Sequence, residues 1–137
     1  MRFAGYAAIF DRPDRGGDVI RRGAFAASLA TSGGATTVPL LWQHKPGEVI
    51  GRIERLQEDG RGLRVIAELG TGTSAQSAAR LIAGGKLDGL SFGYRVRAAG
   101  ETAAGLRELT ELELVEVSLV AQPMQPRARV HAVEQLN

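Results

Sequence analysis

The first third of the chain alternates between apolar runs and short polar segments, which predicts a strand, a loop and a short helix. Residues 3–10 (FAGYAAIF) are almost entirely apolar, as expected for a strand. Residues 11–18 (DRPDRGGD) combine Pro, Gly and Asp, which is typical of a loop. Residues 23–32 repeat apolar and small side chains at helical spacing before a Gly33-Gly34 stop, so they predict a short helix.

Three further strands are predicted next, because apolar side chains alternate with polar ones there. Residues 38–44 (VPLLWQH) form the first, and a turn at residues 45–47 (KPG) leads to the second at residues 49–57. Residues 62–69 (GLRVIAEL) form the third. One face of the first strand would carry Val38, Leu40, Trp42 and His44. Three strands in such close succession predict a meander.

The second half of the chain predicts one helix followed by two long extended segments. Residues 73–83 place small and apolar side chains at helical spacing, between a Thr-Ser cap and a Gly-Gly stop. Residues 87–97 return to strand alternation, residues 98–105 form a small flexible turn, and residues 106–121 form a long extended run. Strands therefore dominate, and we predict a mainly β fold of the α+β class in a single domain over residues 1–137.

Composition and charge narrow the class of protein. Hydrophobic residues make up 44% and charged residues 23% of the 137-residue chain, as in ordinary globular proteins. The 17 basic residues are scattered and the net charge is only +2, so no nucleic-acid partner is expected. No apolar segment is long enough to span a bilayer, so we expect a cytoplasmic protein with no membrane partner. With no cysteine and only two histidines, far apart in the sequence, we expect no disulfide, no metal site and no cofactor.

Residues 89–95 (GLSFGYR) contain a G-x-S-x-G motif centred on Ser91, which raises the question of a serine nucleophile. In α/β-hydrolases this motif lies between a strand and a helix. Here a predicted helix precedes Ser91 and a predicted strand follows it, so a small esterase is kept only as a rival class. On an extended segment Gly89, Ser91 and Gly93 share one face, which would leave room for a peptide backbone beside the hydroxyl. The alternative is an ordinary serine in a turn.

A serine hydroxyl becomes a good nucleophile only when a base takes its proton, so the two histidines are the candidates for that base. His44 ends an apolar strand, where its imidazole would be partly exposed, with a pKa near about 6.5. His131 follows two prolines in a polar segment, where a solvated surface residue is expected. We therefore take His44 as the candidate base, with a purely structural histidine as the alternative.

The acid that would orient this base is sought in residues 112–120 (LELVEVSLV), where the alternation of apolar and polar positions changes phase. Such a change indicates either a β-bulge or a passage into a different environment. Glu116 is flanked by valines in this apolar stretch, and a carboxylate there needs a partner. That partner is either an arginine or His44. Glu111 and Glu113 lie within one strand length and remain alternatives for the acid.

Four segments, in order along the chain, resemble the prohead maturation proteases of tailed bacteriophages, whose relatives include proteases of gene transfer agents. The segments are residues 5–25 (GYAAIFDRPDRGGDVIRRGAF), 40–51 (LLWQHKPGEVIG), 87–96 (LDGLSFGYRV) and 114–130 (LVEVSLVAQPMQPRARV). The resemblance implies a fold similar to herpesvirus assemblins, a β-barrel with a few surrounding helices. It also implies a serine endopeptidase that removes the scaffolding segment of the major capsid protein and cleaves itself and other internal proteins. The expected location is the procapsid, in the cytoplasm of the bacterial host.

Carried over to the matching motifs, the resemblance assigns Ser91 as nucleophile, His44 as general base and Glu116 as the acid that orients the histidine. The donors for the oxyanion stay open: a backbone N–H near Gly93, or the side chain of an arginine such as Arg95 or Arg127. The major capsid protein is the expected partner, and the likeness to assemblins adds a homodimer as an expectation. The alternative from a different class is a non-catalytic capsid assembly or scaffold module with the same fold.

Overall fold

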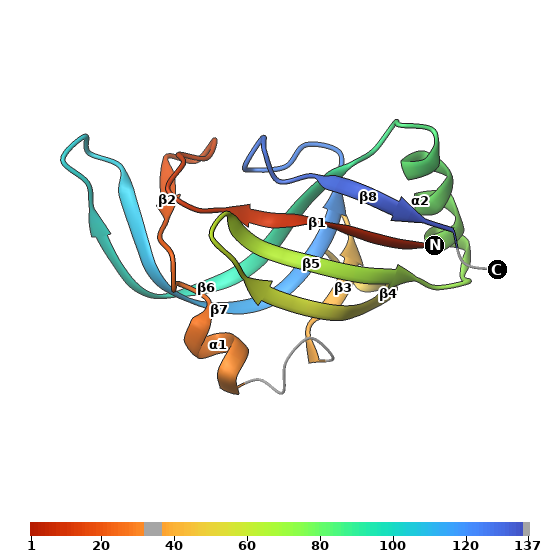
Figure 1. The fold of residues 1–137 in the computed structure, drawn as a ribbon, viewed down its shortest axis with the longest axis horizontal. Helices are drawn as coiled ribbons and strands as arrows, with labels where there is room; N and C mark the ends of the chain where they lie inside the picture. Colours follow the sequence, from red (N-terminus) through yellow and green to blue (C-terminus); the bar gives the residue numbers. More distant parts are fainter. Residues whose placement is uncertain (32–36, 136–137) are drawn as a thin grey trace.

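The described residues form one curved sheet with two helices beside it (Figure 1). The computed structural model describes residues 1–31 and 37–135. The strands are β1 (Arg2–Ile9), β2 (Asp18–Ile20), β3 (Pro39–Trp42), β4 (Lys45–Glu58), β5 (Gly62–Leu69), β6 (Gly89–Glu101), β7 (Arg107–Val120) and β8 (Val130–Glu134). The helices are α1 (Ala26–Thr31) and α2 (Thr73–Ala83). The helix predicted from residue 23 begins later because Gly23 has a φ of 88° in a turn, and its predicted Gly33-Gly34 stop lies outside the described residues.

The strands form a mixed sheet in the order β2-β7-β3-β4-β5-β1-β8, and β6 pairs with β7 outside this path. β2 and β3 run parallel to β7, whereas β6 runs antiparallel to it. The path has two ends, at β2 and β8, so the sheet is not closed into the barrel that the resemblance implied. It curves far enough for the Leu90 N–H, at the start of β6, to donate to the carbonyl of Ala128 just before β8 (3.0 Å). The predicted mainly β, α+β class is confirmed.

The predicted meander is present as β3, β4 and β5, which pair in sequence. The first turn, however, lies at Gln43 and His44 and not at residues 45–47, which begin β4. Trp42 pairs with Lys45 across this two-residue connection. Both turn residues have positive φ, 50° and 61°, as in the type I′ turns whose twist suits a β-hairpin. The twist of the hairpin therefore outweighs the turn preference of Pro and Gly.

β6 and β7 form a long hairpin that projects from the rest of the sheet (Figure 1). The flexible turn predicted at residues 98–105 is shorter than expected, because β6 continues to Glu101. The β6–β7 pairing includes the small residues 98–100 and ends where Glu101 pairs with Arg107. The turn that remains is closed by Gly105 N–H donating to the Thr102 carbonyl (2.9 Å). This hairpin fixes the register of the G-x-S-x-G segment.

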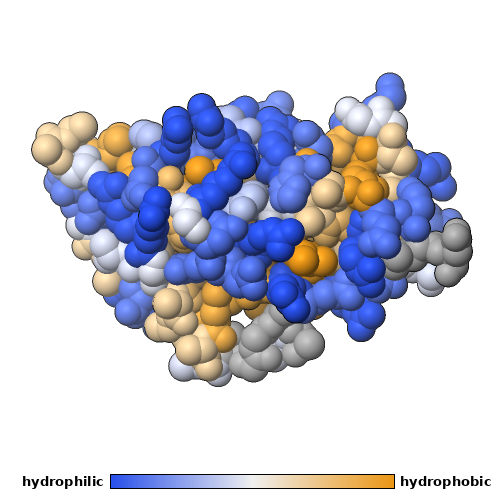
Figure 2. All heavy atoms as spheres, in the orientation of Figure 1, coloured by the Kyte–Doolittle hydropathy of each residue, from blue (hydrophilic) through white to orange (hydrophobic). Residues whose placement is uncertain are grey.

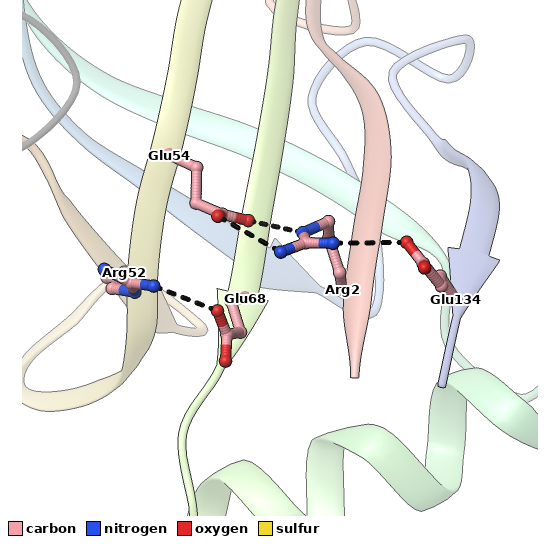
Figure 3. A network of polar contacts seen from close by, with 5 residues as sticks. All are labelled: Arg2, Arg52, Glu54, Glu68 and Glu134. Atoms are coloured by element: carbon pink, nitrogen blue, oxygen red, sulfur yellow. Dashed lines mark hydrogen bonds and ion pairs between the residues drawn. The ribbon is translucent and has the colours of Figure 1, made fainter. Parts of the chain in front are cut away.

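The sequence pattern did not predict β2 or β8, because each is short and takes its hydrogen bonds from a longer neighbour. β2 pairs with β7, and β8 pairs with β1. Arg2 on β1 bonds to Glu134 on β8 (3.2 Å) and to Glu54 on β4 (2.7 Å) (Figure 3). A third ion pair joins Arg52 on β4 and Glu68 on β5 (3.1 Å) (Figure 3). The Arg2–Glu134 pair ties β8 to β1, and the other two pairs link β1, β4 and β5.

The core is built on the buried face of the sheet. Side chains that are almost fully buried there include Phe3, Phe25, Leu40, Leu63, Leu90 and Val117. α1 packs against β7, and α2 packs against β4 and β5. Figure 2 shows that hydrophilic side chains cover most of one face, with apolar groups exposed between them in small patches. No helix within the described ranges has the length and hydropathy needed to cross a bilayer.

Candidate active site

Ser91 lies near the start of β6, directly opposite Ser118 of β7 in the antiparallel pair. Helix α2 comes before it and the strand continues after it, so the strand-to-helix elbow of α/β-hydrolases is absent. Further along the pair, Gly93 lies opposite Glu116. Because directly opposite residues of an antiparallel pair point to the same side of the sheet, these four residues share one face. The esterase alternative lacks the local geometry that it requires.

The two glycines of the motif leave space that the protein's own atoms fill. A Cβ at Gly93 would lie 2.6 Å from Glu116 Oε1, and a Cβ at Gly89 would lie 2.5 Å from the carbonyl oxygen of Val120. The expectation that these glycines leave room for a peptide backbone beside Ser91 is therefore wrong. Gly93 instead allows the Glu116 carboxylate to lie against the strand that carries the serine.

His44 is held by the backbone of its turn rather than by a strand face, which corrects its predicted place at a strand end. Its N–H donates to Ser118 Oγ (3.1 Å). The neighbouring Gln43 donates its N–H to the Leu119 carbonyl (2.9 Å) and accepts at Oε1 from the Ala121 N–H (3.1 Å). The φ of 61° at His44 is uncommon outside glycine, although histidine adopts it more readily than most residues. Bonds to Ser118 and Leu119 of β7 and to Ala121 just after it thus hold the backbone of His44 in place.

The Glu116 side chain receives two hydrogen bonds in the interior of the protein. Its Oε1 is bonded to His44 Nδ1, and its Oε2 accepts from Ser118 Oγ (2.6 Å). Only 7% of Glu116 is exposed, so the carboxylate depends on these partners for the hydration it has lost. Of the two partners weighed from the sequence, an arginine or His44, the structure places the histidine there.

The change of phase in residues 112–120 is a β-bulge, one of the two predicted interpretations. Gly93 pairs with Glu116 and the next residue, Tyr94, pairs with Leu114, so Val115 has no partner across the pair. Val115 is 39% exposed, whereas the residues on either side of it are buried. The extra residue therefore allows the Glu116 side chain to be buried, although Glu116 lies between two valines in the sequence.

The two other acids considered from the sequence lie elsewhere. Glu113 accepts from Arg95 (2.9 Å) and Arg97, and this ion-pair cluster lowers the pKa of Glu113, Arg97 being the stronger influence. Glu111 is exposed on the far part of the hairpin, opposite Ala98. The structure brings Glu116, and neither of these two acids, into contact with the His44 imidazole.

The hydrogen bond to Glu116, helped by its charge, raises the pKa of His44 above its ordinary value of 6.5, while partial burial acts in the opposite direction. A carboxylate bonded to Nδ1 favours the tautomer in which Nδ1 carries the proton. Nε2 is then free to accept a proton from another group. The His44 side chain is 44% exposed and lines a pocket, so the imidazole is open to solvent.

Ser91 and His44 line the same pocket, which has a volume of about 140 Å³. Apolar parts of its wall come from Ile9, Ile20 and Phe92. Small-molecule sites usually measure roughly 300–1,000 Å³, so this pocket has the size for one amino-acid side chain rather than a whole cofactor. A larger hollow of about 470 Å³ lies along α1 and β7; Glu111 and Glu113 line it, but Ser91, His44 and Glu116 do not.

An ion pair that the sequence did not predict stiffens one wall of this pocket. Asp18 accepts from Arg107 Nε and Nη2, each at 2.8 Å, and from the Tyr94 hydroxyl at 3.5 Å. The bonds to Arg107 lower the pKa of Asp18 although its burial opposes this, so the carboxylate stays ionised. The only sequence signal was the β-branched pair Val19-Ile20, which marks a strand directly after an apparent loop.

The remaining candidates have other roles or lie outside the pocket. Neither Arg95 nor Arg127, the two arginines considered for the oxyanion, lines it. His131 is exposed on β8, with its ring centre 5.8 Å from that of Tyr6. The hydrogen bonds found over the described ranges include none between Ser91 Oγ and His44, so the two side chains are related through the pocket that they share. The same part of the chain contains no cluster of three or more side chains able to hold a metal ion.

Comparison with known proteins identifies the family. Residues 1–136 match the family described as caudovirus prohead serine protease, and the chain belongs to that family. The prohead protease of Enterobacteria phage HK97 is 35% identical to it over 96 residues. This alignment covers 69% of the present chain and 42% of the phage protein, so the chain matches less than half of that relative's length.

Solved structures of viral proteases share the fold. The bacteriophage T4 capsid assembly protease has a TM-score of 0.68 at 12% identity, with 87% of this chain and 81% of that one covered. The KSHV protease, in complex with a hexapeptide phosphonate inhibitor, has a TM-score of 0.58 at 13% identity. The match covers 94% of this chain and 63% of that one. The varicella-zoster virus protease has a TM-score of 0.54 at 16% identity, and the match covers 94% of this chain and 62% of that one. The expected likeness to herpesvirus proteases is thereby confirmed at the level of the fold.

Proposed function

We propose that this protein is a serine endopeptidase of procapsid maturation, with Ser91 as nucleophile, His44 as general base and Glu116 as the acid that orients the base. The observation that carries the proposal is the bond between His44 Nδ1 and Glu116 Oε1, made by an imidazole that lines the same pocket as Ser91. Membership of the prohead serine protease family supports the same reaction type.

In the proposed reaction, Ser91 Oγ attacks the carbonyl carbon of the scissile peptide bond while His44 Nε2 removes the hydroxyl proton. His44 then gives this proton to the leaving amine as the C–N bond breaks, which leaves an acyl-serine. A water molecule attacks the acyl group, His44 takes its proton, and the new carboxyl group is released as Ser91 Oγ recovers a proton. Glu116 keeps the imidazole in the Nδ1–H tautomer and stabilises the imidazolium formed in each half of the reaction.

The substrate that we propose is the scaffolding segment of the major capsid protein, together with the protease itself and other internal proteins. The names of two relatives support this choice, since one is a prohead protease and another a capsid assembly protease. The pocket beside Ser91 would hold one side chain of the extended substrate. Cleavage would occur inside the procapsid of a phage or gene transfer agent, in the cytoplasm of the bacterial host. The homodimer expected from assemblins stays a prediction.

The test is co-expression of the cognate major capsid protein with the wild-type chain, with Ser91→Ala, or with the control Ser74→Ala, at an exposed position of α2. The intact mass of the capsid protein is measured in each case. Loss of an N-terminal segment with the wild type and the control, but not with Ser91→Ala, supports the proposal. An unchanged mass in all three, with particles assembled, favours the non-catalytic assembly module. Cleavage that survives in Ser91→Ala removes Ser91 from the mechanism.

A further inference from the structure

Ser118 on β7 is fully buried, and its hydroxyl joins the two groups that would activate Ser91. Its Oγ donates to Glu116 Oε2 (2.6 Å) and accepts from the backbone N–H of His44 (3.1 Å). Since Glu116 Oε1 is bonded to His44 Nδ1, three hydrogen bonds close a ring through the three residues. We propose that Ser118 is a positioning residue that locks the acid and the base in one arrangement, an inference that rests on the proposed function.

The chemistry of a hydroxyl group suits this task, because it offers one proton and two lone pairs. The proton goes to the acid, and a lone pair receives the N–H of the residue that carries the base. A carboxylate held at only one oxygen can turn about its last torsion angle, whereas one held at both oxygens cannot. Ser118 therefore restricts Glu116 to the orientation in which Oε1 meets Nδ1.

The same hydroxyl also fixes the turn that carries His44. That turn places a non-glycine residue at a φ of 61°, a conformation that persists when the surroundings hold it. Among the bonds that hold the turn, the one to Ser118 Oγ is made by the His44 N–H itself. A change at Ser118 would thus move the imidazole from two directions, through its backbone and through its carboxylate partner.

Packing alone does not call for a serine at this position. Ser118 is fully buried and alanine is smaller than serine, so an alanine would fit there without a clash and without polar atoms of its own. The chain also provides a comparison in Ser28, whose buried hydroxyl accepts the N–H of Leu114 on the same strand. Over the described residues, none of the hydrogen bonds of His44 and Glu116 involves Ser28, so Ser28→Ala is a control for the loss of a buried serine hydroxyl bonded to β7.

The experiment compares the wild type with Ser118→Ala, Ser118→Cys and Ser28→Ala. Cysteine keeps the size of the side chain but is a weak donor, so it guards against a loss of folding in the alanine variant. Two experiments are done on each folded protein: steady-state kinetics, which give kcat and KM for cleavage of the capsid protein, and titration of the His44 imidazole by NMR.

We expect Ser118→Ala to lower kcat by about 10- to 100-fold with little change in KM, because the base is misplaced and substrate contacts are not. The pKa of His44 should fall toward 6.5 in Ser118→Ala, since the bond to Glu116 raises it, and Ser118→Cys should lie between this variant and the wild type. Ser28→Ala should match the wild type in both measurements.

Equal kcat and equal His44 titration in Ser118→Ala and Ser28→Ala would overturn the proposal, and so would a loss of activity with no change in the titration. The imidazole titration does not depend on chemistry at Ser91. If Ser91→Ala still cleaves, the proposed function fails, while the titration continues to decide whether Ser118 holds His44 and Glu116 together.

Discussion

Gly93 lies directly opposite Glu116 across the β6–β7 pair, and a Cβ at Gly93 would lie 2.6 Å from the carboxylate oxygen that bonds to His44. The second glycine of the G-x-S-x-G motif is therefore explained by the acid and not by the serine. A side chain on β6 at this point would compete with the carboxylate for the same space. The spacing of the motif links the strand of the candidate nucleophile to the strand of the candidate acid.

Replacing Gly93 by alanine should consequently impair the site from the side of the acid. In Gly93→Ala the carboxylate must move away from the new methyl group, and we expect kcat to fall by about 10²-fold. The matched control is Gly100→Ala on the same strand, where an added Cβ meets no atom within 4 Å. Steady-state cleavage of the capsid protein checks the pair. Wild-type kinetics in Gly93→Ala would show that the position of Glu116 is unimportant.

The pH dependence of cleavage should report the bond between His44 and Glu116. The general base acts when neutral, so kcat/KM should rise with pH through an apparent pKa above 6.5, since Glu116 raises the pKa of His44. In Glu116→Gln the rise should move to lower pH and reach a lower plateau, because the neutral amide neither raises the pKa nor stabilises the imidazolium. A pH–rate profile measures both effects. A profile that does not move would separate Glu116 from the base.

The same bond should make folding stability depend on pH in a defined direction. His44 binds its proton more tightly in the folded than in the unfolded chain, so its contribution is complete below about pH 6.5. That contribution is lost as the pH rises through the raised pKa of the folded state. Urea unfolding of wild type and Glu116→Gln across this range should show the difference shrinking as the pH increases. A difference that grows with pH would contradict this linkage.

The Asp18–Arg107 pair should matter for stability at neutral pH. Arg107→Ala would leave a carboxylate that is 8% exposed without its two bonds, at a cost of about 1–3 kcal/mol. Because Arg107 lowers the pKa of Asp18, the contribution of the pair is present above about pH 3.8 and is lost as the pH falls through the folded-state pKa. The control is Arg52→Ala, which breaks a solvent-exposed pair with Glu68. Equal unfolding free energies for the two variants at pH 7 would contradict this prediction.

Part of this structure could be predicted from local patterns. The slip in alternation around Glu116 indicated a bulge, and Val115 is the unpaired residue that produces it. The alternation of residues 62–69 predicted β5 with the boundaries that it has. In both cases the pattern of buried and exposed positions within one strand carries the information, so no knowledge of a partner strand was needed.

The features that were missed depend on distant neighbours. The turn at Gln43-His44 has no glycine, and its left-handed backbone is held by bonds to residues of β7. Likewise, β2 exists because β7 offers it a parallel edge. Ser118 carried no signal, because a serine between apolar residues acquires meaning only when its two hydrogen-bond partners are known.

The proposed function requires that Ser91 is a nucleophile activated by His44. Treatment of the folded protein with a fluorophosphonate, followed by peptide mass mapping, tests it most directly, since the Ser91 oxygen would displace fluoride and keep the phosphonyl group. If Ser91 is that nucleophile, one adduct should form, on the peptide that contains Ser91, and it should be absent in Ser91→Ala and strongly reduced in His44→Ala. An adduct on a different residue, or an unmodified Ser91 in a preparation that cleaves capsid protein, would contradict it.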